Sequence, residues 1–259
     1  MRDTFDRLWR IVATGFCFSV FGLGGLFLRV AVFPCVRWAV RDPERRAVRV
    51  KAIIRGTFRV FVGLMVRTGV LSLEVHGLDK LHRSGGRLVV ANHPSLVDVV
   101  FLMSFIDRAD CIVKGALARN PFTRGPVASA GFLCNDEGEG LVDDCVASVR
   151  RGNRLIIFPE GSRTPLSGAL PLQRGAARIA VQGGIDITPV RIRCQPRMLA
   201  KGVPWYRVPP RRGHFVIEVC DDIPIAPFLE ARSHAIATRQ LTDHLTDYFF
   251  PLETRRAAT

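Results

Sequence analysis

From Leu71 onward, short apolar runs alternate with longer segments of helical periodicity, and this alternation restricts the fold more than any other feature of the sequence. Apolar runs of four to eight residues indicate strands, whereas apolar residues spaced three or four apart indicate helices. Strands that alternate with helices predict an α/β fold with a mixed, largely parallel central sheet flanked by helices. We expect strands at 71–77, 86–92, 110–115, 154–161, 186–194 and 213–220, and helices at 95–106, 139–152, 174–184 and 233–250.

The residues before this pattern form a separate unit. The chain has 259 residues, enough for one large α/β domain and an appendage. We therefore divide it into N-terminal membrane-associated helices at residues 1–70 and an α/β domain at residues 71–259.

Two segments of the N-terminal unit predict how it meets a membrane. Ile11–Leu28 holds 18 residues without a charge, the short limit for a membrane-spanning helix, and residues 53–71 are amphipathic. Because arginines lie on both sides of Ile11–Leu28, we expect a helical pair that dips into one leaflet at the cytoplasmic face of the inner membrane. A full crossing stays open, as does a helical cap that packs its apolar side on the α/β domain.

The charge of the chain favours an anionic partner. Lys and Arg number 37 against 23 Asp and Glu, which gives a net charge of +14. A bilayer, a nucleic acid or an acidic small molecule would suit this excess. Arginines concentrate beside apolar helices, aromatic residues are only 8%, and we find no nucleic-acid motif, so membrane is favoured over nucleic acid. The seven Cys form no CxxC pair and the six His are scattered, so we expect reduced thiols and no metal.

The first polar insert of interest is Asn-His-Pro-Ser, within VVANHPSLVDVVFLM at residues 89–103. His93 follows a predicted strand, and Asp98 lies five positions later in the first turn of a predicted helix. In one interpretation, Ser95 and Asp98 form a capping box and His93 is a loop residue. In the other, Asp98 accepts a hydrogen bond from one ring nitrogen of His93, and the other nitrogen acts as a base toward a substrate hydroxyl. The spacing alone does not decide between them.

A second insert follows a second predicted strand, in LIIFPEGSRTP at residues 155–165. Glu160, Gly161 and Arg163 should emerge at the same edge of the sheet as His93. Gly161 permits close approach of a ligand to the backbone, and Arg163 offers a planar fork for phosphate or carboxylate. We expect Glu160 either to accept a hydrogen bond from a ligand hydroxyl or to hold Arg163. The alternative is a tight turn with a local ion pair.

The two inserts together resemble the motifs of the glycerolipid acyltransferases, typified by the lysophosphatidic acid (1-acylglycerol-3-phosphate) acyltransferases. The His-x4-Asp motif of that family is matched by His93 and Asp98, and its Phe-Pro-Glu-Gly-Thr-Arg motif by FPEGSR at 158–163. The resemblance covers roughly residues 70–195. It implies His93 as general base oriented by Asp98. It also implies substrate-binding roles at Lys114, Phe158, Glu160, Gly161, Ser162, Arg163 and Arg174.

The same resemblance implies the substrates. They are an acyl chain carried by acyl-CoA or an acyl carrier protein, and a lysophospholipid acceptor, with 1-acylglycerol-3-phosphate favoured. It requires no cofactor and no metal, only membrane lipids and the acyl donor as partners. The alternatives are an acceptor without glycerol phosphate, a thioester hydrolase, or a non-catalytic lipid-binding protein on the same scaffold.

One departure from the family concerns the acceptor. Its second motif carries an Arg that helps to bind the acceptor phosphate, and the best match here, GFLCNDE, places Glu137 at that position. Another cation therefore takes that task, or the acceptor differs. Residues 194–213, rich in Pro and Arg, are long for a connection and are a predicted binding loop.

Overall fold

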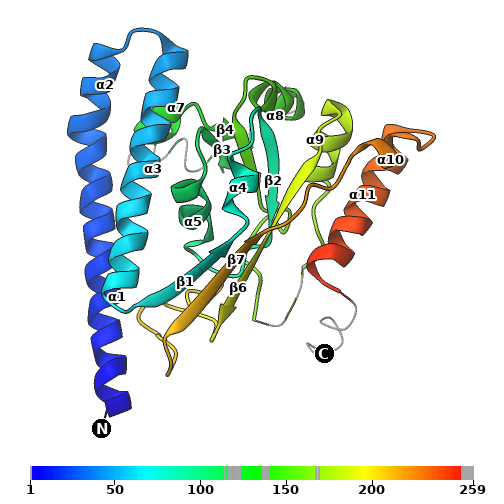
Figure 1. The fold of residues 1–259 in the computed structure, drawn as a ribbon. Helices are drawn as coiled ribbons and strands as arrows, with labels where there is room; N and C mark the ends of the chain where they lie inside the picture. Colours follow the sequence, from blue (N-terminus) through cyan, green and yellow to red (C-terminus); the bar gives the residue numbers. More distant parts are fainter. Residues whose placement is uncertain are drawn as a thin grey trace.

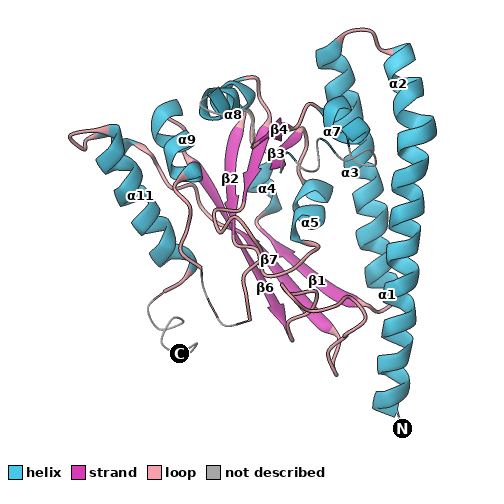
Figure 2. Ribbon diagram, turned by 180° about the vertical axis from the view of Figure 1, so that it is seen from behind, coloured by secondary structure: helices cyan, strands magenta, loops and turns pink. Residues whose placement is uncertain are grey.

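The structure is a computed structural model that describes residues 2–113, 115, 119, 124–135, 140–166, 168 and 170–251. A seven-stranded sheet of order β1-β7-β6-β2-β5-β3-β4 forms its centre (Figures 1 and 2). β6 and β7 pair antiparallel, and the other neighbours pair parallel, so the predicted mixed, largely parallel sheet is confirmed. The strands are β1 Leu71–His76, β2 Arg87–Ala91, β3 Ala109–Val113, β4 Leu133–Cys134, β5 Arg154–Ile157, β6 Ile187–Gln195 and β7 Gly213–Val219.

Both faces of the central strands are buried, which explains why these strands read as continuous apolar runs. Along β2, Val89 and Ala91 belong to one apolar cluster, and Leu88 and Val90 to the other. This alternation follows from the two-residue period of a strand. The first cluster lies under α3 and α5, and the second lies under α8, α9 and α11.

Four helices of the α/β region lie where the sequence predicts them. They are α5 Asp98–Phe105, α8 Leu141–Arg150, α9 Gly175–Gly183 and α11 His234–Phe249. Four short elements were not predicted from the sequence: α4 Leu78–Leu81, α7 Arg124–Ala130, α10 Ala226–Leu229 and the two-residue strand β4. Seven residues or fewer leave too short a window for periodicity to be read.

The N-terminal residues form two long antiparallel helices at one side of the sheet (Figure 1). The first is continuous through α1 Arg2–Phe27, the π-helical turn η1 Leu28–Val32 and α2 Phe33–Ala39; the second is α3 Pro43–Arg67. The second helix begins at Pro43, before the amphipathic stretch at 53–71. Asp42 caps α3 by accepting a hydrogen bond from the Arg45 amide at 2.7 Å, and Pro43 occupies its first turn.

The helical pair packs on the sheet through α3 and faces outward through α1. Ile54, Phe61 and Met65 of α3 are buried in the same cluster as strand residues, and Phe61 contacts Phe21 of α1 with ring centroids 4.6 Å apart. The cap-like packing that we considered as an alternative is therefore present. The boundary proposed at residue 70 falls between α3 and β1, and the division into two domains stays a prediction.

The outward side of α1 is apolar. Its exposed apolar side chains recur every three or four residues and continue into η1: Phe5, Leu8, Val12, Phe16, Val20, Leu23, Phe27 and Val30. Among the described residues, Thr4–Ala39, which is 36 residues long, is the one helical segment that contains an apolar stretch long enough to cross a membrane. Because a large exposed apolar surface is unfavourable in water, this side indicates membrane association.

A buried ion pair connects α3 to the sheet. Lys51 Nζ lies 3.2 Å from Asp110 Oδ2, and both side chains are at least 95% buried. Ser148 Oγ donates to the same carboxylate oxygen at 2.6 Å. The pair fixes the helix against β3 at a point where a mismatch would leave a buried charge unpaired.

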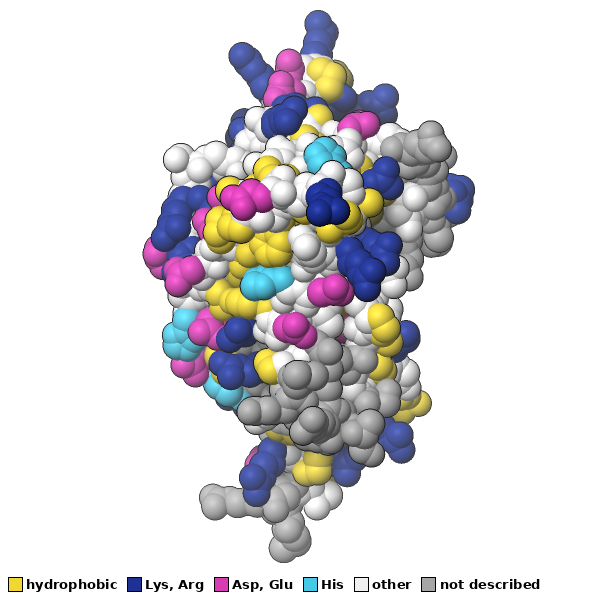
Figure 3. Space-filling model, turned by 90° about the vertical axis from the view of Figure 1, so that its right-hand side faces the viewer, with side chains coloured by type: hydrophobic (Ala, Val, Ile, Leu, Met, Phe, Trp, Pro, Cys, Tyr) yellow, Lys and Arg dark blue, Asp and Glu magenta, His cyan; other side chains and the backbone are white. Residues whose placement is uncertain are grey.

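The opposite side of the molecule has a mixed surface. On the face that carries α9 and α11, basic side chains lie among acidic and apolar ones and form no continuous stripe (Figure 3). A nucleic-acid-binding protein would gather its basic side chains on one such surface. This face gives no support to the nucleic-acid alternative.

Candidate active site

The two polar inserts meet at the carboxyl edge of neighbouring parallel strands. His93 follows β2, and the FPEGSR segment follows β5, which pairs with β2. The Asn92 side chain fixes the end of β2 because it makes two hydrogen bonds to the backbone of Ile192 on β6, at 2.8 and 2.7 Å. The Thr164 amide donates to the His93 carbonyl at 2.7 Å, which joins the two inserts directly.

His93 and Asp98 form a hydrogen-bonded pair. His93 Nδ1 lies 2.8 Å from Asp98 Oδ2, and the His93 side chain is 18% exposed while that of Asp98 is fully buried. Occupation of Nδ1 by a carboxylate leaves Nε2 as the ring nitrogen that can act as a base. A phenyl ring holds the imidazole in place, because Phe158 stacks on it at a centroid distance of 4.2 Å and an interplanar angle of 26°.

Asp98 also organises the start of α5. The Ser95 amide donates to its Oδ2 at 2.6 Å, and Ser95 Oγ donates to its Oδ1 at 2.5 Å. The helix begins at Asp98 itself and its capping position is Val97, with no side-chain cap, so of the capping box only the bond from the Ser95 amide to the Asp98 carboxylate is present. Asp98 therefore serves the chain turn and the imidazole at once. Burial raises the pKa of Asp98, and the hydrogen bond from His93 opposes that shift.

Glu160 supports the His93 loop from below. Its Oε1 accepts hydrogen bonds from the His93 amide at 2.8 Å and from Thr164 Oγ1 at 2.9 Å. The side chain is buried, its Oε2 has no hydrogen-bond partner, and burial raises its pKa. Holding Arg163 was one of the two roles that we expected for Glu160. Its carboxylate instead binds the His93 amide and the Thr164 hydroxyl.

Arg163 holds backbone rather than a carboxylate. Its Nη1 donates to the carbonyls of Leu199 and Ala200 at 3.0 and 3.1 Å. Gly161, with φ of 65°, provides the left-handed turn that brings Ser162 and Arg163 back toward the sheet edge. The remaining guanidinium nitrogens of Arg163 keep donors for a ligand.

The other predicted substrate-binding residues do not all lie together with the His93–Asp98 pair. Ser162 Oγ lies 3.1 Å from Lys201 Nζ, a contact that the sequence analysis did not foresee. Arg174 is exposed at the N-cap of α9, and the structure gives it no contact with His93 or Asp98. Lys114, together with Glu137 of the second motif, lies outside the described residues.

Part of the 194–213 connection is buried more deeply than its Pro- and Arg-rich sequence indicates. Met198, Leu199 and Ala200 are at most 4% exposed and lie against the loops of the site. The Leu96 amide donates to the Leu199 carbonyl at 3.0 Å, so this connection contacts both inserts. The apolar triplet Met-Leu-Ala inside a Pro- and Arg-rich segment was the available signal.

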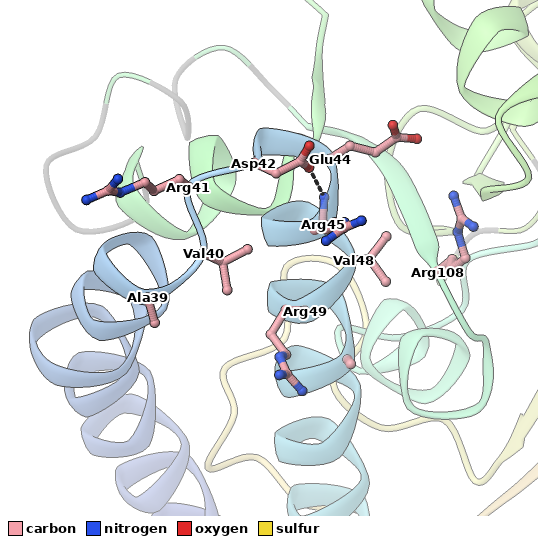
Figure 4. Close-up of a pocket in the computed structure, with 10 residues that line it drawn as sticks. Ala39, Val40, Arg41, Asp42, Glu44, Arg45, Val48, Arg49 and Arg108 are labelled. Carbon is pink, nitrogen blue, oxygen red and sulfur yellow. Dashed lines mark hydrogen bonds between the residues drawn. The ribbon is translucent and has the colours of Figure 1, made fainter.

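A separate cavity lies at the other end of the molecule. It has a volume of about 970 Å³ and lies between the α2–α3 turn and Arg108, which precedes β3. Four arginines line part of it, and Figure 4 shows Arg41 and Arg45 pointing to opposite sides. Since β3 runs parallel to β5, and β5 to β2, Arg108 lies at the amino edge of these strands, away from His93. This cavity is not part of the site.

Comparisons with known proteins agree with this geometry. The family model "Acyltransferase" matches residues 72–193, the region that holds both inserts. Over 165 residues the chain is 31% identical to the putative 1-acyl-sn-glycerol-3-phosphate acyltransferase acl-2 of Caenorhabditis elegans, covering 61% of this chain and 57% of that protein. It is 30% identical over 130 residues to the 1-acyl-sn-glycerol-3-phosphate acyltransferase of Helicobacter pylori, covering 48% of this chain and 53% of that protein.

The fold also matches a solved structure. The crystal structure of the 1-acyl-sn-glycerophosphate (LPA) acyltransferase PlsC from Thermotoga maritima superposes with a TM-score of 0.69 over 99% of this chain and 96% of that one. At 18% identity this likeness shows the fold alone. The paired inserts and the family match define an acyltransferase-type domain. Residues 72–193 match the Acyltransferase family, and the chain spans about half the length of the curated relatives that it matches.

Proposed function

We propose that this protein is a membrane-associated O-acyltransferase. It would move an acyl chain from acyl-CoA or an acyl carrier protein to a hydroxyl of a lysophospholipid-like acceptor, with 1-acylglycerol-3-phosphate favoured. The observation that carries the proposal is the hydrogen-bonded pair of a partly exposed His93 and a fully buried Asp98, 2.8 Å apart, beside FPEGSR. The acceptor is favoured because two relatives carry that substrate in their names.

The chemistry follows from the orientation of the imidazole. Asp98 keeps the proton on Nδ1, so Nε2 accepts the proton of the acceptor hydroxyl as its oxygen attacks the thioester carbonyl. The buried carboxylate then stabilises the imidazolium that forms. When the tetrahedral intermediate collapses, the carbon–sulfur bond breaks and the imidazolium returns its proton to the leaving thiolate. The products are an ester and a free thiol, and no acyl-enzyme is formed.

The N-terminal helices support the proposal that the acceptor is a lipid. The apolar stripe of α1 would let the enzyme rest in the membrane that supplies the acceptor and receives the product. The flanking arginines favour the cytoplasmic face of the inner membrane, where acyl-CoA and acyl carrier protein are found. The positive net charge suits these anionic donors and the bilayer alike.

The test is a product analysis on the purified full chain. Acyl-CoA or acyl carrier protein is supplied with and without lysophosphatidic acid, and the products are identified by mass spectrometry. We expect acylated lipid that depends on the acceptor. Free fatty acid formed equally without acceptor would instead identify a thioester hydrolase, and vesicle binding without turnover would identify a lipid-binding protein.

A further inference from the structure

The first half of the connection between β6 and β7 is held over the candidate site in an unfavourable backbone conformation. Leu199 has φ of 53°, in the left-handed region that branched side chains rarely adopt. Its carbonyl accepts hydrogen bonds from the Leu96 amide and from Arg163 Nη1, both at 3.0 Å. Such a conformation persists only where its surroundings impose it, and it often marks a functional position.

This conformation fixes the two cations on either side of it. Lys201 extends to Ser162 Oγ at 3.1 Å, and Arg197 Nη1 donates to the Pro165 carbonyl at 2.7 Å. Lys201 and Arg197 thus both contact the segment from Ser162 to Pro165, which itself carries a third cation, Arg163. Within the described part of the chain, no carboxylate forms an ion pair with any of the three.

Two cations elsewhere on the surface have carboxylate partners. Lys80 pairs with Asp221 at 2.8 Å, and Arg239 contacts Asp243 at 3.9 Å. A solvated surface cluster would be neutralised in the same manner or would leave its long side chains free to move. Holding the Lys201 ammonium on the hydroxyl of Ser162, the residue that precedes Arg163, costs side-chain entropy and brings positive charge toward a loop that already carries one. An anion that binds among them would offset both costs.

We propose that Lys201, together with Arg163 and Arg197, binds the phosphate of the acceptor. The inference rests on the proposed function and names its specificity residues. Glu137 stands where related motifs carry a phosphate-binding Arg, so the charge must come from another element. Lys201 supplies a compact charge and the arginines supply planar donors, a combination suited to a phosphomonoester. Thr164 and Glu160 tie this loop to His93, so the phosphate is held beside the base.

Chemical labelling tests the subsite without relying on turnover. The full chain is acetylated with an amine-reactive ester, and the modification of Lys201 and Lys80 is measured by peptide mass spectrometry. The arms contain lysophosphatidic acid, monoacylglycerol with the same chain, or inorganic phosphate. We expect lysophosphatidic acid to protect Lys201 several-fold, phosphate to protect it only at high concentration, and monoacylglycerol not to protect it. Lys80 is the internal control, because it pairs with Asp221 and contacts neither Ser162 nor Pro165. Equal labelling of Lys201 in all arms would overturn the proposal.

Kinetics separate this inference from the proposed function. Lys201→Gln and Arg197→Gln should each raise KM for lysophosphatidic acid about tenfold while kcat changes little, since a hydrogen bond to a charged group is lost. Lys201→Arg should retain most of the affinity. Arg239→Gln makes the same charge change on α11 and should leave KM unchanged. A wild-type protein that acylates lysophosphatidic acid while Lys201→Gln keeps its KM refutes the subsite alone. A wild-type protein without acyl transfer refutes the proposed function, and the labelling result still decides the subsite.

Discussion

Replacing Asp98 by Asn isolates the role of the buried carboxylate at nearly constant volume. The carboxylate accepts hydrogen bonds from His93 Nδ1 at 2.8 Å, from the Ser95 amide at 2.6 Å and from Ser95 Oγ at 2.5 Å. In the D98N variant one of the two carboxylate oxygens becomes an NH₂ group. If the NH₂ group faces Ser95 Oγ, the hydroxyl can rotate to accept, and His93 keeps a neutral acceptor. If it faces His93, the imidazole is forced into the tautomer that cannot act as a base through Nε2.

The two orientations bound the loss of activity. A charge-assisted hydrogen bond exceeds a neutral one by about 1.4 kcal/mol, which corresponds to about tenfold in kcat. The wrong tautomer costs up to about 10⁴-fold in enzymes that use such a pair. We therefore expect kcat for acyl transfer to fall between these limits, with KM for both substrates little changed.

The assay follows thiol release and acylated lipid together, with the thermal unfolding temperature as a second readout. Because burial raises the pKa of Asp98 above its ordinary value, the carboxylate disfavours the folded state as the pH rises through that range. The neutral amide of the D98N variant lacks this penalty, so its unfolding temperature should match or exceed that of the wild type at pH 7. Ser95→Ala, which removes one donor and keeps the charge, is the control and should lower kcat only a few-fold. Wild-type kcat in D98N would refute the role given to this carboxylate.

Three further outcomes are expected. Lys51→Met should lower the free energy of unfolding by about 3–5 kcal/mol, because Asp110 stays buried without its cation, and K51M/D110N should recover part of it; chemical unfolding that shows no loss would contradict the pairing. As the pH rises above 4.5, the unfolding temperature of Glu160→Gln should increase relative to that of the wild type, because burial raises the pKa of Glu160 and its ionisation then disfavours folding. Unfolding temperatures of the two proteins that keep a constant difference across this pH range would refute this. Leu23→Asp on the outward side of α1 should weaken sedimentation with anionic vesicles, whereas Ile236→Asp on α11 should not; equal retention of both would argue against membrane docking through α1.

The sequence predicted the parts of the site that local geometry determines. A strand end and a helix start separated by five residues bring His93 and Asp98 together, and parallel strands bring FPEGSR to the same edge. The partners of Glu160 and Arg163 could not be read in the same way. They bond to the backbone of His93 and of Leu199, which are distant in the sequence.

In the N-terminal helices, too, the sequence predicted local features but not those that depend on distant contacts. The apolar stretch Ile11–Leu28 was recognised, but the continuous helix runs far beyond both of its ends. The start of α3 was missed although Asp42-Pro43 is a helix-start signal, because the arginines that follow obscured the apolar period. Which side of α1 faces outward depends on packing with Phe58 and Phe61 of α3, which no local pattern specifies.

The most direct measurement of the central claim is the rate of acyl transfer by His93→Ala to lysophosphatidic acid in a single turnover. As general base, His93 should contribute about 10²–10⁴-fold to the chemical step, so the rate should fall by that factor. Vesicle binding should match that of the wild type, and the protein should stay folded with a lowered unfolding temperature, because the buried Asp98 loses one hydrogen-bond partner while the backbone contacts of residue 93 remain. A His93→Ala protein that transfers the acyl chain at the wild-type rate would contradict the account.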